Sequence, residues 1–262
     1  MEIVFVFAAA LVFLHLTNIW KSFAIPSCSL RPSRVPAILH SVLLLVCTVI
    51  LIFVLTQWAD REVRSDATWI FFYLAFSLAL ILAAQEIFAL LGVSWRDDFV
   101  ERRNVSAAIA VVGFTLGVTF CVAGANIGNG PGWWVVLVCA VLSIGALLGA
   151  WMTLNWIARV AETITIERDV DAGIRVGGFL VTGGIIFGIS VSGDWQSVEV
   201  TVADFIRSAW PVAVLLIAVS IYERALQRRS LSKREPGIGI SIAIAAAMIA
   251  AAAAHAKHAG VR

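Results

Sequence analysis

Charged residues are scarce in this sequence of 262 residues. Asp, Glu, Lys and Arg together make up 14% of it, whereas hydrophobic residues make up 61%. A soluble globular domain carries about 25% charged residues, so this composition excludes an ordinary soluble fold. The lipid bilayer is instead the natural solvent for such a chain.

The sequence also lacks the motifs of common intramembrane and nucleotide-dependent enzymes. It contains no HExxH zinc motif, no GxSxG nucleophile turn and no Walker loop. Its cysteines show no CxxC spacing and are interpreted as buried thiols, namely Cys28, Cys47, Cys121 and Cys139. We therefore expect no catalytic activity, no cofactor, no metal site and no nucleic-acid partner.

Long hydrophobic runs dominate what is present. A membrane-spanning helix needs about 20 apolar residues, and inside lipid each backbone amide must be satisfied within its own helix. The sequence therefore predicts an all-α, polytopic membrane helical bundle that forms a single domain over residues 1–262. The eight predicted spans are 3–20, 37–58, 69–93, 105–128, 133–158, 172–193, 205–226 and 240–260.

Positive charge alternates between the connections. The segments 21–36, 94–104, 159–175 and 223–235 hold 3, 3, 3 and 5 Lys and Arg residues, and the alternate connections hold fewer. By the positive-inside rule the basic set is cytoplasmic. We expect a multi-pass protein of the bacterial inner membrane with both termini in the periplasm.

An internal repeat with a shift of 65 positions is predicted. Residues 103–114 match residues 168–179 at seven of twelve positions, and a looser copy begins at Arg234. Each unit would be a pair of helices, which makes the copies parallel. The predicted units are 69–128, 133–193 and a degenerate 205–260, preceded by an extra helix pair over 1–58.

The repeat places a polar residue just before a membrane helix in each copy. Asn104 and Asp169 share this register and are interpreted as helix caps, because their side chains can accept hydrogen bonds from the free amides of the first turn. Asp171 and Arg175 have no counterparts in the first copy. They are four residues apart and can pair on one helix face, so snorkelling to the surface and binding of a ligand or partner both stay open for Arg175.

Other polar residues inside the predicted spans collect at the cytoplasmic ends. With Asp171 and Arg175, we expect Glu86, Asn155, His15 and His40 to form a shallow polar cluster facing the cytoplasm. A lone carboxylate at Glu86 needs a partner or a proton, and an Arg175–Glu86 pair is the sharpest hypothesis. The alternative is that the helix ends early and residues 87–93 lie at the interface.

Glycine pairs with GxxxG spacing recur in three consecutive spans. In lipid, two small residues on one helix face allow neighbouring backbones to approach closely, so we expect a tightly packed central bundle. A homodimer through one of these faces is left open. The pairs begin at Gly113, Gly124, Gly145, Gly173 and Gly184.

With this repeat, the sequence resembles the YjfL-like family of bacterial inner-membrane proteins, a domain of unknown function. Tandem helix pairs with a charged connector, an Asn and a helix rich in Ala and Gly carry the resemblance, and Arg103–Gly113 fits this pattern best. The similarity covers roughly 69–226, and the second copy departs from it at Asp169. The resemblance implies an inner-membrane protein without known catalysis, sometimes encoded beside membrane-remodelling proteins of the phage-shock type.

Three functions are compatible with these observations. The leading hypothesis is a non-enzymatic scaffold or envelope-stress accessory that presents its cytoplasmic loops, such as the basic segment 222–235, to a protein partner. The alternative is a transporter or channel for a small solute or ion that uses Glu86 and Arg175. The third is an enzyme acting on lipid at the inner leaflet.

Overall fold

The computed structural model of the 262-residue chain describes residues 35–229 and 237–258. The predicted first span, 3–20, lies outside the described residues, as does His15. The other seven predicted spans fall within them, except for residues 259–260 of the last span. The helices are α2 Val35–Gln57, α3 Arg61–Ser65, α4 Ala67–Leu90, the π-helix η1 Trp95–Glu101, α5 Val105–Ala125, α6 Trp133–Ala158, α7 Val160–Thr165, α8 Val170–Val191, α9 Val198–Arg229 and α10 Ile238–His258.

Seven of these helices are long and apolar enough to cross a membrane: α2, α4, α5, α6, α8, α9 and α10. No strand forms in the described part of the chain, where an isolated bridge joins Ala59 to Gly128. The predicted all-α, polytopic membrane bundle is thus confirmed. The largest difference in extent is at α9, which spans 32 residues and begins well before the predicted 205–226.

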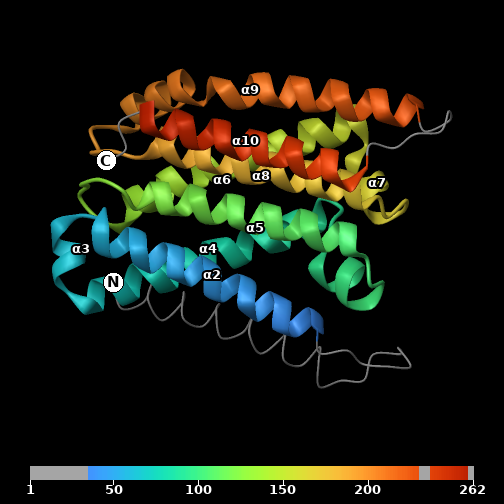
Figure 1. Cartoon of the computed structure of the whole chain (residues 1–262). Coiled ribbons are helices and arrows are strands. Elements are labelled where there is room, and N and C mark those ends of the chain that lie inside the picture. The colour runs from blue at the N-terminus through green and yellow to red at the C-terminus, as the bar shows by residue number, and fades with distance from the viewer. Residues whose placement is uncertain (1–34, 230–236, 259–262) are drawn as a thin grey trace.

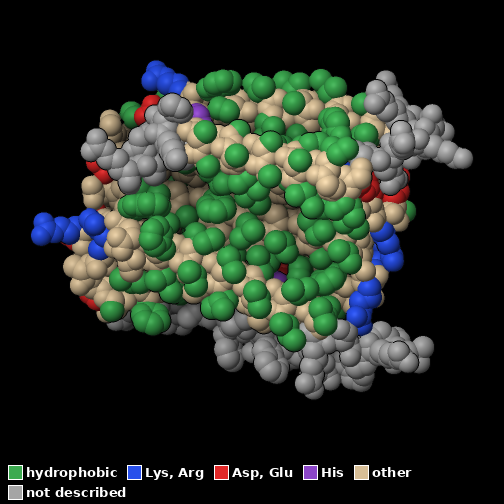
Figure 2. Space-filling model, viewed as in Figure 1, with side chains coloured by type: hydrophobic (Ala, Val, Ile, Leu, Met, Phe, Trp, Pro, Cys, Tyr) green, Lys and Arg blue, Asp and Glu red, His purple; other side chains and the backbone are tan. Residues whose placement is uncertain are grey.

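The long helices run side by side between two ends of the bundle (Figure 1). One end, here called the connector end, holds η1, α7 and the starts of α5, α8 and α10. The other, called the pocket end, holds α3 and the turns 126–132 and 192–197. Hydrophobic side chains cover the face between the two ends, and charged side chains gather toward the ends (Figure 2). This distribution suits a protein whose middle is surrounded by lipid.

Helices α5 and α8 form the centre. In their most apolar windows 72% and 78% of the residues are buried, against 22% in α9 and α10. Glycines allow this contact, since a Cβ atom added to Gly124 would overlap the carbonyl oxygen of Gly188, and one added to Gly113 would overlap the backbone of Gly177. Such backbone approach is possible only with very small residues. A Cβ atom added to Gly145 or Gly149 in α6 would meet nothing within 4 Å, so that pair packs against no other part of the described chain.

The backbone positions that flank α5 have dihedral angles similar to those that flank α8. Arg103 and Arg168, which precede the caps of α5 and α8, have left-handed φ angles of 56° and 60°. Gly128 and Gly193, which follow the same helices, have φ angles of 111° and 128°. Both correspondences have the spacing of 65 residues that the sequence repeat uses, although the duplication itself stays a prediction.

Candidate functional site

Arg175 forms the centre of a buried charged cluster at the connector end. Its side chain is 2% exposed and lies one turn inside α8. Its Nε and Nη2 donate to the two carboxylate oxygens of Glu223 in α9 at 2.6 and 3.0 Å, and its Nη1 donates to the hydroxyl of Ser241 in α10 at 2.9 Å. The ring of Tyr222 lies 5.7 Å from the guanidinium carbon. This residue does not snorkel to the surface, because three helices enclose it.

Two more carboxylates of α8 complete the cluster. Asp169 caps the helix, its Oδ1 accepting from the amides of Asp171 and Ala172 at 2.8 and 3.2 Å, and its Oδ2 lies 3.9 Å from Nη2 of Arg175. Asp171 is 8% exposed, and its Oδ1 is buried with no hydrogen-bond partner in the described chain. The cluster therefore holds three carboxyl groups against one guanidinium.

The hypothesised pair between Arg175 and Glu86 is not formed. The described hydrogen bonds of Arg175 go to Glu223 and Ser241, and its two ion pairs are with Glu223 and Asp169. Glu86 is exposed on α4, which ends four residues later at Leu90. The helix ends three residues before the predicted end at 93, so Glu86 lies near the end of α4.

The remaining described members of the predicted cluster, His40 and Asn155, make local contacts. His40 in α2 is 3% exposed, and its ring centroid lies 5.1 Å from that of Trp95 in η1. Asn155 near the end of α6 accepts from the amide of Ala161 at 2.9 Å and so stabilises the start of α7. The described contacts of His40 and Asn155 are thus with η1 and α7, whereas those of Arg175 are with α9 and α10.

Asn104 caps α5 and also joins two connectors. Its Oδ1 accepts from the amide of Ala107 at 3.2 Å, while its Nδ2 donates to the carbonyl oxygens of Ile164 and Thr165 at 2.8 and 3.3 Å. The side chain is 1% exposed. A further hydrogen bond joins the starts of the two helices, because the hydroxyl of Ser106 in α5 donates to the carbonyl oxygen of Asp169, the cap residue of α8. The caps therefore fix the two central helices to each other.

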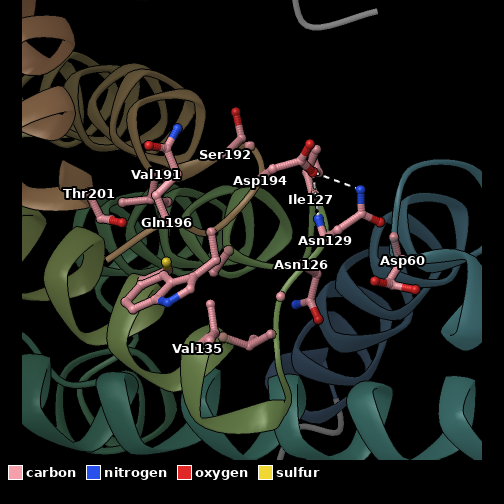
Figure 3. A pocket seen from close by; sticks show the side chains of 18 of the residues that line it. Asp60, Asn126, Ile127, Asn129, Val135, Val191, Ser192, Asp194, Gln196 and Thr201 are labelled. Carbon is pink, nitrogen blue, oxygen red and sulfur yellow. Dashed lines mark hydrogen bonds between the residues drawn. The ribbon is translucent and has the colours of Figure 1, made fainter. Parts of the chain in front are cut away.

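A cavity of about 250 Å³ opens at the pocket end, where α2, α3, α4, α5, α6, α8 and α9 converge (Figure 3). Asp60, Asp194 and Asp204 line it, and no Lys, Arg or His is found among its described lining residues. Trp195 and Tyr73 contribute aromatic surface. An opening with this lining favours a positively charged ligand over an anion.

Hydrogen bonds between the turns 126–132 and 192–197 shape this cavity. Asp194 Oδ1 accepts from the backbone amide and from Nδ2 of Asn129, each at 2.8 Å (Figure 3). The amide of Trp195 donates to the carbonyl oxygen of Asn129 at 2.8 Å, and that of Gly193 donates to Ile127 at 3.0 Å. The wall of the cavity is therefore preformed, with Asp194 as part of its framework.

The aspartates of the cavity are only partly engaged by described groups. Asp60 Oδ1 caps α3 by accepting from the amide of Glu62 at 2.8 Å, and Asp194 also uses Oδ1. Asp204 lies 3.7 Å from Arg207, a pair whose side chains are both largely exposed. A carboxylate offers two oxygens, and an exposed ion pair is weak. Acceptors for a cation are therefore available.

Sequence reasoning missed both Glu223 and this cavity. Glu223 belongs to the basic segment 222–235, which the sequence predicts as a cytoplasmic loop, yet it is only 2% exposed. A signal was present, since Phe205, Val212, Val219 and Glu223 follow helical spacing and all are buried. The cavity had no such signal, because its residues come from turns and helix ends that are distant in the sequence.

Comparison with known proteins places the centre of the chain in one family. The model of the family described as Domain of Unknown Function (DUF350) matches residues 62–191. The YjfL-like resemblance is consistent with this match, but the match ends at Val191, so α9 lies outside it although the sequence resemblance had been taken to about 226. No curated protein and no solved structure matches the chain.

The matched segment runs from α3 to the last residue of α8. Asp171 and Arg175 therefore lie inside it, whereas their neighbours Glu223 and Ser241 come from α9 and α10 outside it. Residues 62–191 of this multi-pass membrane protein match the model of the DUF350 family, a domain of unknown function, and the helices that follow complete its charged cluster.

Proposed function

We propose that this protein binds a small organic cation in the cavity at the pocket end and carries it across the membrane. The observation that carries the proposal is the lining of the cavity, which contains Asp60, Asp194 and Asp204 and no described basic residue. Aromatic surface from Trp195 and Tyr73 suits an alkylammonium group, because aromatic faces attract cations. In the described residues no group of three or more His, Cys, Asp or Glu is arranged to hold a metal ion.

Polar groups deeper in the bundle support transport over simple binding. The cluster around Arg175 places two further buried carboxylates, Asp171 and Glu223, at the opposite end of α8. The hydroxyls of Thr182 in α8 and Ser220 in α9 are also buried with no hydrogen-bond partner in the described chain. Buried polar groups are costly inside a membrane and often mark the pathway of a solute. In this proposal the residues of the cavity and of the charged cluster act in transport, and Glu86 does not.

The orientation follows from the charge distribution. The connector end carries the described basic connections 94–104 and 159–175 and is cytoplasmic under the positive-inside rule, which makes the pocket end periplasmic in the bacterial inner membrane. A pair of parallel repeats centred on α5 and α8 is part of the same proposal. It is supported by the common geometry of Arg103 and Arg168 and of Gly128 and Gly193.

Flux into proteoliposomes tests the proposal. Radiolabelled methylammonium and tetramethylammonium would be offered to liposomes that contain the purified protein, with Asp194→Asn as the test variant. This change keeps an acceptor oxygen for Asn129 but removes the charge, and we expect uptake to fall about tenfold, equivalent to about 1.4 kcal/mol. Asp97→Asn, an exposed acid of η1 at the other end, is the matched control. Wild-type uptake no greater than that of empty liposomes would overturn the proposal.

Docking of a cytoplasmic partner is the second candidate. It is favoured by exposed charged side chains on η1 and around α7, where Arg96 and Arg159 have side chains 73% and 74% exposed. The basic connector that suggested this role is partly used inside the bundle, since Arg224 and Gln227 donate to the last carbonyl oxygens of α6. Native co-purification after cross-linking would test it, and recovery of self-cross-links alone would argue against a docked partner.

A further inference from the structure

We propose that Asp171 binds a proton at the connector end and that this proton exchanges for the organic cation during transport. The exchange rests on the proposed function, whereas proton binding itself stands on the geometry of the cluster. The residues concerned are Asp169, Asp171 and Arg175 of α8 and Glu223 of α9.

The first argument is the isolation of one carboxylate oxygen. Asp171 is 8% exposed, and its buried Oδ1 has no donor in the described chain. An ionised carboxylate that leaves one buried oxygen without a donor is unfavourable in a medium of low polarity, and a proton bound at that oxygen lowers the cost. A proton bound at this oxygen would turn the uncompensated acceptor into a hydroxyl group.

The second argument is that the other two carboxylates already accept hydrogen bonds from described donors. Both oxygens of Glu223 accept from the guanidinium of Arg175. Oδ1 of Asp169 accepts two amide hydrogen bonds at the positive end of the α8 dipole. Hydrogen bonds to a carboxylate favour its ionised state. Asp171 is thus the member of the cluster that takes up the proton.

The surroundings of Asp171 supply no second described cation. On its own helix it faces Asp169 and Arg175, and α9 contributes Glu223 and Tyr222. The hydroxyl of Ser241 comes from α10 and interacts with the Asp171 carboxyl, and the hydroxyl of Ser106 in α5 donates to the backbone carbonyl of Asp169. At α7, Glu162 pairs with Arg159 at 4.0 Å on the exposed surface.

The described hydrogen bonds of Arg175 go to groups other than Asp171. Its Nε and Nη2 are bound to Glu223, and its Nη1 is bound to Ser241. With all three acids ionised, the four charged groups of the cluster would sum to −2. Protonation of Asp171 removes one of these negative charges.

The proposed step is a simple transfer. Hydronium on the connector side gives a proton to Oδ1 of Asp171, leaving water and a neutral carboxylic acid. Return of the proton to water regenerates the carboxylate. Loss of a negative charge at one end of α8 when the cation leaves the other end would keep the charge of the protein balanced.

Infrared difference spectroscopy of the purified full-length protein in lipid nanodiscs tests proton binding independently of flux. We expect a carbonyl stretching band of a protonated carboxylic acid that changes with pH and shifts in D₂O. The band should be absent in Asp171→Asn, present in Asp97→Asn and moved in frequency in Asp171→Glu. The last variant keeps an acid at the position and guards against loss of folding in the first. An unchanged band in Asp171→Asn and in Asp171→Glu would overturn the inference.

Flux measurements separate the two proposals. Tetramethylammonium uptake by the wild type should respond to an imposed pH gradient, and the response should be lost in Asp171→Asn. An Asp171 band without any uptake would sink the proposed function and leave the proton site standing. Uptake that responds to the gradient equally in Asp171→Asn would exclude Asp171 from the exchange.

Discussion

Arg175 and Glu223 lie 48 residues apart in the chain and form a bidentate ion pair, with Nε–Oε1 and Nη2–Oε2 distances of 2.6 and 3.0 Å. Both side chains are at most 3% exposed. The pair links α8, which belongs to the DUF350 segment, to α9, which follows it. It therefore fixes how the additional helices dock on the family domain.

Replacing only one member of this ion pair should strongly destabilise the protein. We expect Arg175→Met or Glu223→Leu alone to cost about 3–5 kcal/mol, because each leaves one buried charge without its partner. The double variant should cost less than the sum of the two. Unfolding in detergent, followed by intrinsic fluorescence, would measure the coupling in a double-mutant cycle.

Two controls accompany this cycle. Arg207→Ala removes an exposed pair with Asp204 and should change stability by about 0–1 kcal/mol. Glu86→Gln combined with Arg175→Met should be additive, because Glu86 is not among the described partners of Arg175. Strong coupling in that combination would contradict the arrangement of the cluster.

Glycine substitutions should have different effects on stability in α5, which packs closely against α8, and at the glycines of α6 that meet no described neighbour. Gly124→Ala places a Cβ atom on the backbone of Gly188, and we expect a loss of about 1–3 kcal/mol from overpacking. Gly149→Ala in α6 meets nothing within 4 Å. It should be neutral or stabilise the helix by up to about 1 kcal/mol, since Ala has the higher helix propensity. Thermal unfolding of both variants in the same detergent gives the comparison, and equal losses would argue against close α5–α8 packing.

Asn104 should contribute more to stability than an ordinary helix cap. Asn104→Ala loses the cap of α5 and both bonds to the connector before α8, and we expect a cost of about 2–4 kcal/mol. Asp66→Ala removes an exposed cap of α4 and should cost about 1 kcal/mol. Asn104→Asp keeps the acceptor but not the donor, so an intermediate loss is expected. If Asn104→Asp unfolded like the wild type, the bonds to Ile164 and Thr165 would have no measurable role.

Cysteine labelling should report the predicted orientation. In a variant whose four native cysteines are replaced by Ala, Ser192→Cys at the pocket end should react with a membrane-impermeant maleimide added to intact cells. Glu167→Cys at the connector end should react only after the membrane is opened. Cys47, Cys121 and Cys139 are free and buried, so replacing them removes background without touching the surface. The reverse pattern would show that the positive-inside rule fails for this chain.

The sequence by itself determined the features that depend on local physics. Apolar runs long enough to cross a membrane predicted seven described helices, because the lipid core permits backbone polar groups only inside such elements. Asn104 and Asp169 were identified as caps from their position before those runs, since capping involves residues only two or three apart.

The tertiary structure alone decided which polar groups meet. Arg175 pairs with Glu223 rather than Glu86 because α8 packs against α9, and the choice of neighbouring helices is not encoded in the spacing of either segment. The cavity between Asp60, Asp194 and Asp204 likewise forms where turns from distant parts of the chain converge. Hydrophobic runs specify that helices cross the membrane, whereas close packing of small residues specifies beside which helix each one lies.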